Sequence, residues 1–565
     1  MKTILLTFFL FLSTLQAQSD FRFFINNINL PINNAGTLAY VNIPPDGPGG
    51  LYLGTNFLFS GGFWLSGYNS DTLWANAMAS SILIENYQPG NVDSNQYDPR
   101  YRIYVVNESD QPFGGSWQEW TFAVDIGAEF YDGDNDGIYN PVDLNGNGEW
   151  DINEDRPDII GDQIAWCVFN DGVYPRNRFE NVPPLGIEIH QTVFGYKSSS
   201  APQLKNVLFI RYKIFNKGTV NSLLDSVYFT AWTDPDLGNY FDDLVGCDTL
   251  TKSGYVYGLD PDPGFGDEVP SFFINLLQGP YSYIPGETFI DNNSNGTYED
   301  SIDTPLDSAY NHQGPVNGFQ IFPGAKNQTM TAFTHNISSV PQRNDPTDEF
   351  EARNFMLGLL RSGGPIDPCN DPFGDVFGIP CDDPSIDPRF WYSGDPESNY
   401  GWLNIIPTDQ RMAVHTGPFF LEVDKPITII VGYTIGQGDS PLNSVTVGKE
   451  VSAFVQQFYQ SNFDDNILPV EEENSLIVDE FKLFQNYPNP FNPATNIGFR
   501  IADFGFVSFK VYDVLGSEVA TLVNDEKPAG SYEVKFSATG LPSGIYFYKL
   551  QTESFIETKK MILLK

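Results

Sequence analysis

Two acidic segments of the chain carry side-chain oxygens at alternate positions around a glycine. The first, DGDNDGIYNPVDLNGNGEWDINED, begins at Asp132, and the second, DNNSNGTYEDSID, begins at Asp291. Alternate Asp and Asn residues before a glycine turn supply several oxygen ligands from one short stretch of chain. A hard divalent cation of the size of Ca²⁺ prefers six to eight such oxygens. The spacing therefore predicts calcium-binding loops near residues 132–155 and 291–303, with Ca²⁺ as the cofactor.

The first segment fits the loop pattern D-x-[DN]-x-[DN]-G-x₅-E twice, and the first fit has Asp where the pattern closes with Glu. In this assignment Asp143 is shared, as the last ligand of loop one and the first of loop two. The predicted ligands, which include one main-chain carbonyl in each loop, are Asp132, Asp134, Asp136, Ile138, Asn140 and Asp143 in loop one, and Asp143, Asn145, Asn147, Glu149, Asp151 and Glu154 in loop two.

The third loop repeats only the first half of the pattern. Its predicted ligands are Asp291, Asn293, Asn295, Thr297 and Glu299. The twelfth position is Ile302, and Asp303 comes one place late, so the closing ligand is missing from the expected position. A solvated acidic turn is the alternative for every one of these loops. A further run, WTDPDLGNYFDDLVGCD, contains Asp234, Asp236, Asp242 and Asp243 and is either a fourth cation site or an acidic turn.

The sequence around the loops predicts how they are held. WTFAVDIGAEFY, before the first loop, predicts a strand, and no clear helix follows directly. The paired helices of a calcium sensor are therefore not expected. The loops resemble the strung calcium loops of thrombospondin type 3 repeats and of dockerins, and this resemblance implies a structural role for the cation.

Signals for catalysis are few. The four histidines, His190, His312, His335 and His415, never occur at metal-ligand spacing. H-E-x-x-H, G-x-S-x-G, the phosphate-binding loop and the dinucleotide fingerprint are all missing from the sequence. A pair of acidic catalytic residues leaves no local pattern, so a hydrolase stays an alternative. His190 lies in a predicted strand, where a packed or surface histidine is the simpler interpretation.

The composition predicts a β-rich exported body. The chain has 30 basic and 72 acidic residues and a net charge of −42. Residues 1–480 carry a net charge of −43, and residues 481–565 carry +1. Such a field repels nucleic acid and attracts divalent cations. Short runs such as VLFIRYKIFNKG, LDSVYFTAWTD, SGYVYGLD and ITIIVGYTIG alternate with turns, which is typical of all-β sandwiches. We therefore expect an all-β, multidomain β-sandwich body over residues 18–465, with two or more lobes.

Two local features complete the body. Val447, Val451, Phe454 and Phe458 are spaced four, three and four residues apart, which predicts a helix that covers the end of a sheet. Cys369 and Cys381 bracket a loop rich in Pro, Asp and Gly and are predicted to form a disulfide. Cys167 and Cys247 are then either a second bridge or buried thiols.

Both ends of the chain predict export. Residues 1–17 have one lysine, an apolar run and then small residues, which is the pattern of a cleaved signal peptide. That run is too short to span a bilayer, which needs about 20 residues, and no later segment is long and apolar enough. An acidic linker, residues 466–480, then leads to about 85 residues with strand runs separated by turns. The strand pattern predicts a small immunoglobulin-like β-sandwich at residues 481–565, in which Val507, Phe509 and Val511 share one sheet face.

The blocks NYPNPFNPATNI, VYDVLGSEV, PAGSYEV, LPSGIYFYKL and KKMILLK of this tail resemble, in order, the type A sorting domain of the bacterial type IX secretion system. The resemblance implies that residues 481–565 engage the secretion machinery, and that the body is secreted or attached to the outer-membrane surface. Runs of the body, among them GGFWLSGY and HTGPFFLEVDKPITIIVGYTIG, resemble a group of large bacterial surface proteins that carry the same tail, which implies no known activity.

Three functions for the body follow. The first is a calcium-binding, non-catalytic structural or adhesive protein at the cell surface, which contacts other cell-surface proteins. The second is an extracellular glycan-binding protein, whose stacking faces would be Trp64, Trp74, Trp117, Trp120, Trp391 and Trp402, although burial in the core is the alternative for each. The third is a hydrolase of polysaccharides or peptides.

Overall fold

The computed structural model describes two compact units, Met1–Leu468 and Pro469–Lys565. In the first unit the described residues are 19–79, 86–173, 182–197, 201–338 and 340–464. In the second they are 482–483, 486, 489, 491–501, 505–514, 516–527, 530–552 and 555–563. The expected signal peptide and acidic linker lie outside the described residues. Strands account for 44% and helices for 9% of the structure, which confirms the predicted all-β class with a sandwich-like body.

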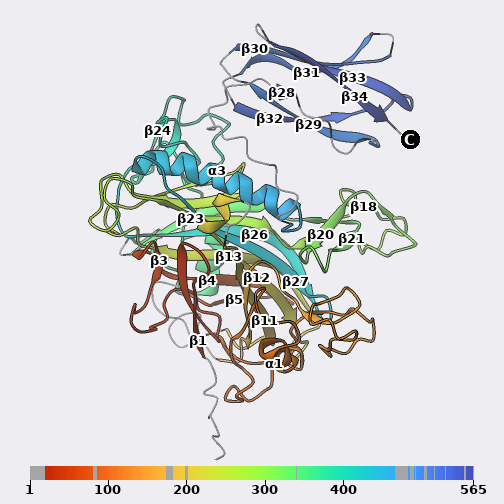
Figure 1. The fold of residues 1–565 in the computed structure, drawn as a ribbon. Helices are drawn as coiled ribbons and strands as arrows, with labels where there is room; N and C mark the ends of the chain where they lie inside the picture. The colour runs from red at the N-terminus through yellow and green to blue at the C-terminus, as the bar shows by residue number, and fades with distance from the viewer. Residues whose placement is uncertain are drawn as a thin grey trace, which may run out of the picture. The chain divides into compact units, whose positions relative to one another are not determined.

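The first large sheet of the body is antiparallel, in the order β1-β2-β3-β4-β13-β26-β23, with β5 paired to β4. Its strands are β1 (Asp20–Phe23), β2 (Ile28–Asn33), β3 (Gly50–Tyr52), β4 (Thr55–Asn69), β5 (Thr72–Ala77), β13 (Leu223–Pro235), β23 (Met330–Ile337) and β26 (Gln410–Glu422). The pairing of β4 with β13, and of β13 with β26, joins segments that are far apart in the sequence (Figure 1).

The second large sheet has the order β14-β15-β16-β27-β12-β11-β10-β6, with β7 paired to β10. Its strands are β6 (Gln88–Pro89), β7 (Tyr104–Asn107), β10 (Gln163–Asn170), β11 (Ile187–Gly195), β12 (Val207–Asn216), β14 (Leu244–Asp248), β15 (Ser253–Tyr257), β16 (Ser271–Gln278) and β27 (Ile427–Gly436). The runs VLFIRYKIFNKG, LDSVYFTAWTD, SGYVYGLD and ITIIVGYTIG thus form β12, β13, β15 and β27, as predicted.

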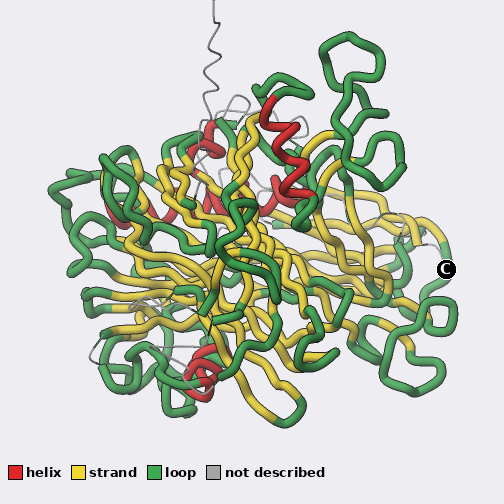
Figure 2. The backbone as a smooth tube through the Cα atoms, turned by 90° about the horizontal axis from the view of Figure 1, so that it is seen from below, coloured by secondary structure: helices red, strands yellow, loops and turns green. Residues whose placement is uncertain are grey.

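Aromatic side chains fill the core between the two sheets. Phe63 of β4 stacks on Phe229 of β13 with ring centres 5.8 Å apart, and it meets Tyr212 of β12 edge-on at 5.1 Å. All three side chains are buried. Each large apolar side chain removed from water contributes about 1.5–3 kcal/mol. Figure 2 shows strands through the interior of the body and helices near its periphery.

Helix α3 (Pro441–Gln460) confirms the predicted helix near the end of the body. Ser440 caps it, because its side chain accepts a hydrogen bond from the N–H of Asn443 at 3.2 Å. Val451 and Phe458 are buried, and the other two residues of the predicted face are half-buried against the same core. The helix packs on β27 and β16, so the second sheet is covered on both faces and its strands are apolar almost throughout.

The prediction of a strand at residues 120–131, before the first calcium loop, is wrong for most of these residues. Residues Gly115–Val124 form helix α1, and only Phe130–Tyr131 form a strand, β8. Trp117, Trp120 and Ala123 are spaced three residues apart and are all buried, which is the spacing of one helical face. The run of aromatic and β-branched residues suggested a strand, but this buried face decides for the helix. A second short helix, α2 (Glu349–Met356), packs against the first sheet.

Short two-stranded ladders carry the loops that leave the body. They pair β8 with β9 (Arg156–Pro157), β17 (Tyr281–Tyr283) with β22 (Ala325–Asn327), β18 (Phe289–Ile290) with β19 (Thr304–Pro305), β20 (Ser308–His312) with β21 (Phe319–Pro323), and β24 (Gly374–Phe377) with β25 (Gly401–Asn404). The predicted disulfide between Cys369 and Cys381 is present, and Cys167 and Cys247 are buried free thiols. No helix within the described residues has both the length and the apolar character needed to cross a membrane.

The C-terminal unit consists of two sheets around its own core. One has the order β28-β29-β32 and the other β31-β30-β33-β34. The strands are β28 (Lys482–Leu483), β29 (Ala494–Ile501), β30 (Gly505–Tyr512), β31 (Glu518–Lys527), β32 (Gly530–Ser537), β33 (Gly544–Gln551) and β34 (Ile556–Leu563). Val507, Phe509 and Val511 are all fully buried in this core, so they share one face as predicted. The immunoglobulin-like class of this unit stays a prediction.

Candidate functional site

The predicted metal-binding segments leave the body through two similar ladders. Residues 132–155 lie between β8 and β9, in which Tyr131 pairs with Arg156. Residues 291–303 lie between β18 and β19, in which Ile290 pairs with Thr304. Each segment is therefore an excursion that starts from one strand of a two-residue ladder and returns through the other.

The three loops share one backbone conformation. The fourth and sixth residues of each loop have positive φ; they are Asn135 (60°) and Gly137 (78°) in loop one, Gly146 (74°) and Gly148 (78°) in loop two, and Ser294 (59°) and Gly296 (79°) in loop three. Glycine adopts this left-handed conformation without steric cost, which explains the glycine at position six of each loop. The repeat of the same conformation at three sites indicates one loop type.

The first aspartate of each loop accepts hydrogen bonds from the N–H groups of the fifth and sixth residues. These bonds join Asp132 to Asp136 (3.1 Å) and Gly137 (2.9 Å), Asp143 to Asn147 (3.2 Å) and Gly148 (2.7 Å), and Asp291 to Asn295 (3.2 Å) and Gly296 (2.6 Å). In loop one this turn brings carboxylate oxygens of Asp132, Asp134 and Asp136 within 4.8 Å of one another. Three carboxylates at this separation repel one another unless a cation lies among them.

In loops two and three the side chains of positions three, five and nine converge. Asn145 and Asn147 donate amide hydrogens to Asp151, at 2.5 and 2.9 Å. The corresponding bonds of loop three join Asn293 and Asn295 to Glu299, at 2.5 and 2.8 Å. Carboxylate and amide oxygens are the ligands that Ca²⁺ prefers. Binding of a cation here requires the two amides to turn, so that their oxygen atoms replace their N–H groups at the centre.

The carboxylate that closes loop one in the structure is not the one that the pattern assigned. Asp155, buried at the base of loop one, accepts the N–H groups of Gly133 (2.9 Å) and Asn140 (2.7 Å), which are the second and ninth residues of that loop. Burial raises the pKa of Asp155 above its usual value. The carboxylate of Asp143 is engaged by the N–H groups of loop two, from Gly148 first, and these bonds hold its pKa below the usual value.

The other two loops are closed at the same two backbone positions. Glu154 accepts the N–H groups of Leu144 (2.7 Å) and Asp151 (2.9 Å), and Asp303 accepts those of Asn292 (2.9 Å) and Glu299 (2.8 Å). Asp155 and Asp303 each stand directly before the returning strand, in the sequences Asp-Arg-Pro and Asp-Thr-Pro. Loop two is therefore an insertion within loop one. A search for Asp-x-Pro after each segment would have found both residues.

An aromatic residue at position eight anchors each loop to the preceding strand. The pairs are Tyr139 with Phe130 (ring centres 5.2 Å apart), Trp150 with Tyr131 (5.6 Å) and Tyr298 with Phe289 (5.4 Å). Tyr139 also donates its hydroxyl hydrogen to the carbonyl of Trp117 at 3.0 Å. The loops are thus fixed to the scaffold by packing, whatever they bind.

The fourth acidic run contributes to a different cluster. Carboxylate oxygens of Asp234, Asp236 and Asp409 lie within 4.8 Å of one another. Asp234 is buried and pairs with Arg411 at 3.1 Å. Burial raises the pKa of Asp234 to about 8 and that of Asp236 to about 6. Asp243 lies nearby and accepts the N–H of Leu237 at 3.2 Å. The arginine supplies a positive charge inside this cluster, so the cluster differs in kind from the three loops.

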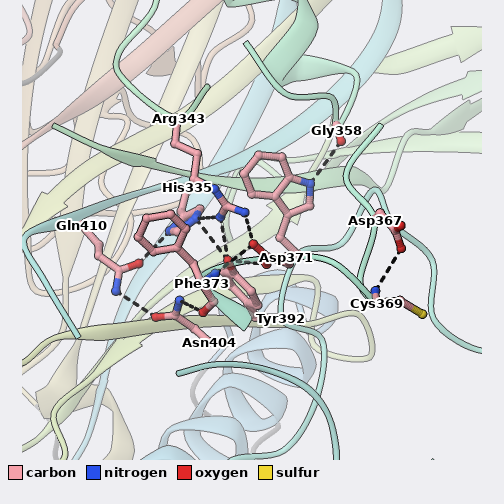
Figure 3. A network of polar contacts seen from close by, with 11 residues as sticks. His335, Arg343, Gly358, Asp367, Cys369, Asp371, Phe373, Tyr392, Asn404 and Gln410 are labelled. Carbon is pink, nitrogen blue, oxygen red and sulfur yellow. Dashed lines mark hydrogen bonds and ion pairs between the residues drawn. The ribbon is translucent and has the colours of Figure 1, made fainter. Parts of the chain in front are cut away.

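The four histidines are all buried. Figure 3 shows the network around His335, which accepts a hydrogen bond from Arg343 and contacts Gln410 at 2.7 Å. Arg343 also pairs with Asp371, whose other oxygen accepts the hydroxyl of Tyr392 at 2.9 Å. Burial first, and then Arg343, lowers the pKa of His335 well below its usual value, so this histidine is neutral.

This network has a structural role. Asp371 belongs to the loop that the disulfide closes, whereas His335 lies on β23 and Gln410 on β26. The ion pair with Arg343 therefore fastens the disulfide loop to the first sheet. His190 of β11 contacts Glu188 at 3.1 Å and packs on Trp166, so it is a packed histidine of the second sheet.

Burial overturns the predicted use of tryptophans for sugar stacking. Their exposed fractions are 1% for Trp64, 2% for Trp74, 4% for Trp117, 1% for Trp120, 0% for Trp391 and 1% for Trp402. These side chains belong to the hydrophobic cores, and none of them presents a face to a ligand.

One small chamber has carboxylates from Glu129 and Asp158 in its wall, and a pair of carboxylates is what a glycoside hydrolase uses. Its volume of about 10 Å³ suffices for a single water molecule but not for a sugar ring. Glu129 pairs with Lys213 at 2.5 Å, and Asp158 pairs with Arg211. The two acids are thus committed to ion pairs in a space that admits no substrate.

The tail gives the clearest relationship to known proteins. Residues 485–564 match the family described as the secretion system C-terminal sorting domain. This match confirms the predicted type IX sorting domain, and proteins sorted by this system are secreted or attached to the cell surface. The chain is therefore an exported, β-rich protein that carries a type IX sorting domain.

Comparison with curated proteins gives no match. Among solved structures, a polysaccharide lyase aligns with 67% of this chain and 34% of its own, at 6% sequence identity and a TM-score of 0.20. The chain spans about a third of the length of that lyase. So low a TM-score carries no argument about fold or activity.

Proposed function

We propose that the body of this exported protein is a calcium-binding, non-catalytic scaffold with a structural or adhesive role at the cell surface. The observation that carries this proposal is the repeat of one loop geometry at three sites. Each site has the same pair of left-handed residues, the same bonds to its first aspartate and a closing carboxylate at the same two backbone positions. A solvated acidic turn has no reason to repeat this arrangement three times.

The residues that would hold the cations are the predicted ligands of positions one, three, five, seven and nine. To these we add Asp155 as the closing carboxylate of loop one and Asp303 as that of loop three, while Glu154 closes loop two. A carboxylate oxygen that accepts one N–H retains a second lone pair, so it can still bind a metal ion. Bound Ca²⁺ would neutralise the clustered carboxylates and stiffen both excursions on their ladders.

Calcium should therefore stabilise the folded protein. Extracellular calcium modules have dissociation constants of about 0.1–1 mM. A ligand that binds only the folded state at ten times its Kd contributes about 1.4 kcal/mol per site, so three sites give roughly 4 kcal/mol. The test is calorimetric unfolding of the signal-processed chain in calcium, in magnesium and in chelator. We expect the melting temperature to rise by several degrees in calcium alone. Equal melting temperatures in all three conditions would mean that the loops are solvated turns.

The second candidate function, glycan binding, depends on a feature other than the tryptophans, a cavity beside loop three.

A further inference from the structure

A cavity of about 570 Å³ lies beside loop three, between β17, β21 and the turn that joins β26 to β27. We call it the loop-three groove, and its aromatic lining consists of Tyr281, Tyr283, Tyr298, Phe322 and Phe420. Its volume is within the range of about 300–1,000 Å³ that is usual for ligand pockets. We propose that the loop-three groove binds a short segment of a neutral glycan. The hairpin of β20 and β21 and the β18 excursion, beside which it lies, are seen in Figure 1.

The aromatic side chains of the groove are arranged as flat pairs. Tyr281 stacks on Phe322 with ring centres 4.2 Å apart and an angle of 17° between the planes. Tyr283 stacks on Tyr298 at 5.3 Å and 11°. Phe420 is 48% exposed at the rim. The electron-rich face of such rings attracts the polarised C–H groups on the apolar face of a sugar ring. Unlike the tryptophans of the core, these rings line an open space.

The hydroxyl of Tyr298 lacks a protein partner. It is buried, and no hydrogen bond to it is found among the described residues. Tyr139, at the same position of loop one, donates its hydroxyl hydrogen to the carbonyl of Trp117. A buried hydroxyl without a partner costs free energy, which a ligand with its own hydroxyl groups can recover. Tyr139 and Tyr298 occupy the same position in their loops, but only Tyr139 has a hydrogen-bond partner for its hydroxyl among the described residues. A ligand beside loop three would supply the partner that Tyr298 lacks.

The charges of the groove favour a neutral ligand. Its lining contains two lysines, Lys213 and Lys425, and two carboxylates, Glu422 and Asp424. Lys425 pairs with Glu422 at 2.9 Å, and Lys213 pairs with Glu129 at 2.5 Å. Both lysines are therefore held in ion pairs, Asp424 remains as a carboxylate in the lining, and no positive charge is left to bind an anionic group. The acidic body as a whole also repels anionic glycans. Asn311, Gln320 and Thr428 add amide and hydroxyl groups that can pair with sugar hydroxyls.

The position of Tyr298 is fixed by its surroundings. A Cβ atom on Gly324 would lie 2.4 Å from Cε2 of Tyr298, so only glycine leaves room for this ring. Gly324 also has a φ of 79°, which other residues rarely adopt. Tyr298 packs on Tyr283 and Phe289, so we expect the ring to keep its place without calcium in loop three. Gly296 and Thr297 of the same loop also line the groove, so the test compares binding with and without calcium.

The test is binding of the full signal-processed chain to an array of immobilised neutral oligosaccharides, acidic oligosaccharides and short peptides. The variants are Tyr298→Phe, which removes only the hydroxyl, and Tyr281→Ala, which removes one stacked face. Tyr97→Ala is the matched control, because Tyr97 is 82% exposed and does not line the groove. We expect binding to neutral oligosaccharides that weakens about tenfold or more in both groove variants and is unchanged in the control. Without oligosaccharide, the melting temperature of Tyr298→Phe should equal or exceed that of the wild type, because the substitution removes a buried hydroxyl that has no partner among the described residues.

Three results would overturn the proposal. They are no binding to any neutral oligosaccharide, binding that both groove variants retain, and a preference for the peptides, which would assign the groove to a protein partner. Running the array in millimolar calcium and in chelator keeps the two proposals apart. Glycan binding that is equal in both conditions supports the groove while giving no support to calcium in loop three.

Discussion

The replacement of Asp155 by alanine tests the assignment of the closing carboxylates. In the structure this side chain accepts two backbone hydrogen bonds, from Gly133 at 2.9 Å and from Asn140 at 2.7 Å. Bonds to a charged group contribute about 1.5–3 kcal/mol each. The burial that raises the pKa of Asp155 also makes its ionised form less favourable and offsets part of this gain. We therefore expect Asp155→Ala to lower the free energy of local opening of loop one by about 2–3 kcal/mol.

Amide hydrogen exchange measured by mass spectrometry is the suitable assay, because the loop can open without global unfolding. A loss of 2–3 kcal/mol corresponds to exchange that is about 30–150-fold faster in residues 132–140. In calcium, Asp155→Ala should abolish the protection of loop one and leave that of loop two, and Asp143→Ala should do the reverse. Asp300→Ala, an exposed carboxylate with no assigned ligand role, is the control. If Asp143→Ala exposes both loops equally, Asp143 is shared and this reasoning is wrong.

Deletion of residues 481–565 should leave the protein in the periplasm, and its appearance in the medium would contradict the role of the tail. Asp371→Ala should destabilise the protein by about 3–5 kcal/mol in urea unfolding, because it leaves Arg343 buried without its partner, whereas the exposed Asp367 can be replaced at little cost. Burial opposes the ionisation of Glu188, but the interaction with His190, the N–H of Val92 and the charge of Lys217 together outweigh it and lower the pKa to about 2. Its stabilising contribution is therefore complete above the unfolded value of 4.5 and is lost as the pH falls towards 2. Replacement of Glu188 by glutamine should flatten the stability curve in that interval, and an unchanged slope would contradict the shift.

Local patterns in the sequence predicted the elements of the fold but not their arrangement. The alternation of β-branched and aromatic residues identified strands such as β12 and β27, and the four-three-four spacing identified α3. The pairing of β13 with β26 joins residues nearly 200 positions apart, such as Phe229 with Thr416, and no local pattern encodes it. Helix α1 was mistaken for a strand because its aromatic residues have high strand propensity, while its buried face at Trp117 and Trp120 decided the outcome.

The calcium loops were likewise predictable where their ligands are close together in the sequence, but not where the fold brings residues together. Positions one to nine of each loop follow from a contiguous pattern, and the structure gives all three loops one conformation. The closing residues depend on where the chain returns to the ladder, so a fixed length of twelve residues missed Asp155 and left Asp303 one place outside the pattern. The cluster of Asp234 and Asp409 arises only because β26 lies beside β13, and the groove arises from segments that the sequence does not connect.

Equilibrium dialysis of the signal-processed chain against radioactive calcium measures the central claim directly. The account predicts saturable binding of three calcium ions per chain, with dissociation constants of about 0.1–1 mM. Asp291→Ala should reduce this number to two, and Asp155→Ala should remove the ion of loop one alone. The absence of saturable binding, or a number of bound ions that neither substitution changes, would contradict the assignment of these loops to calcium.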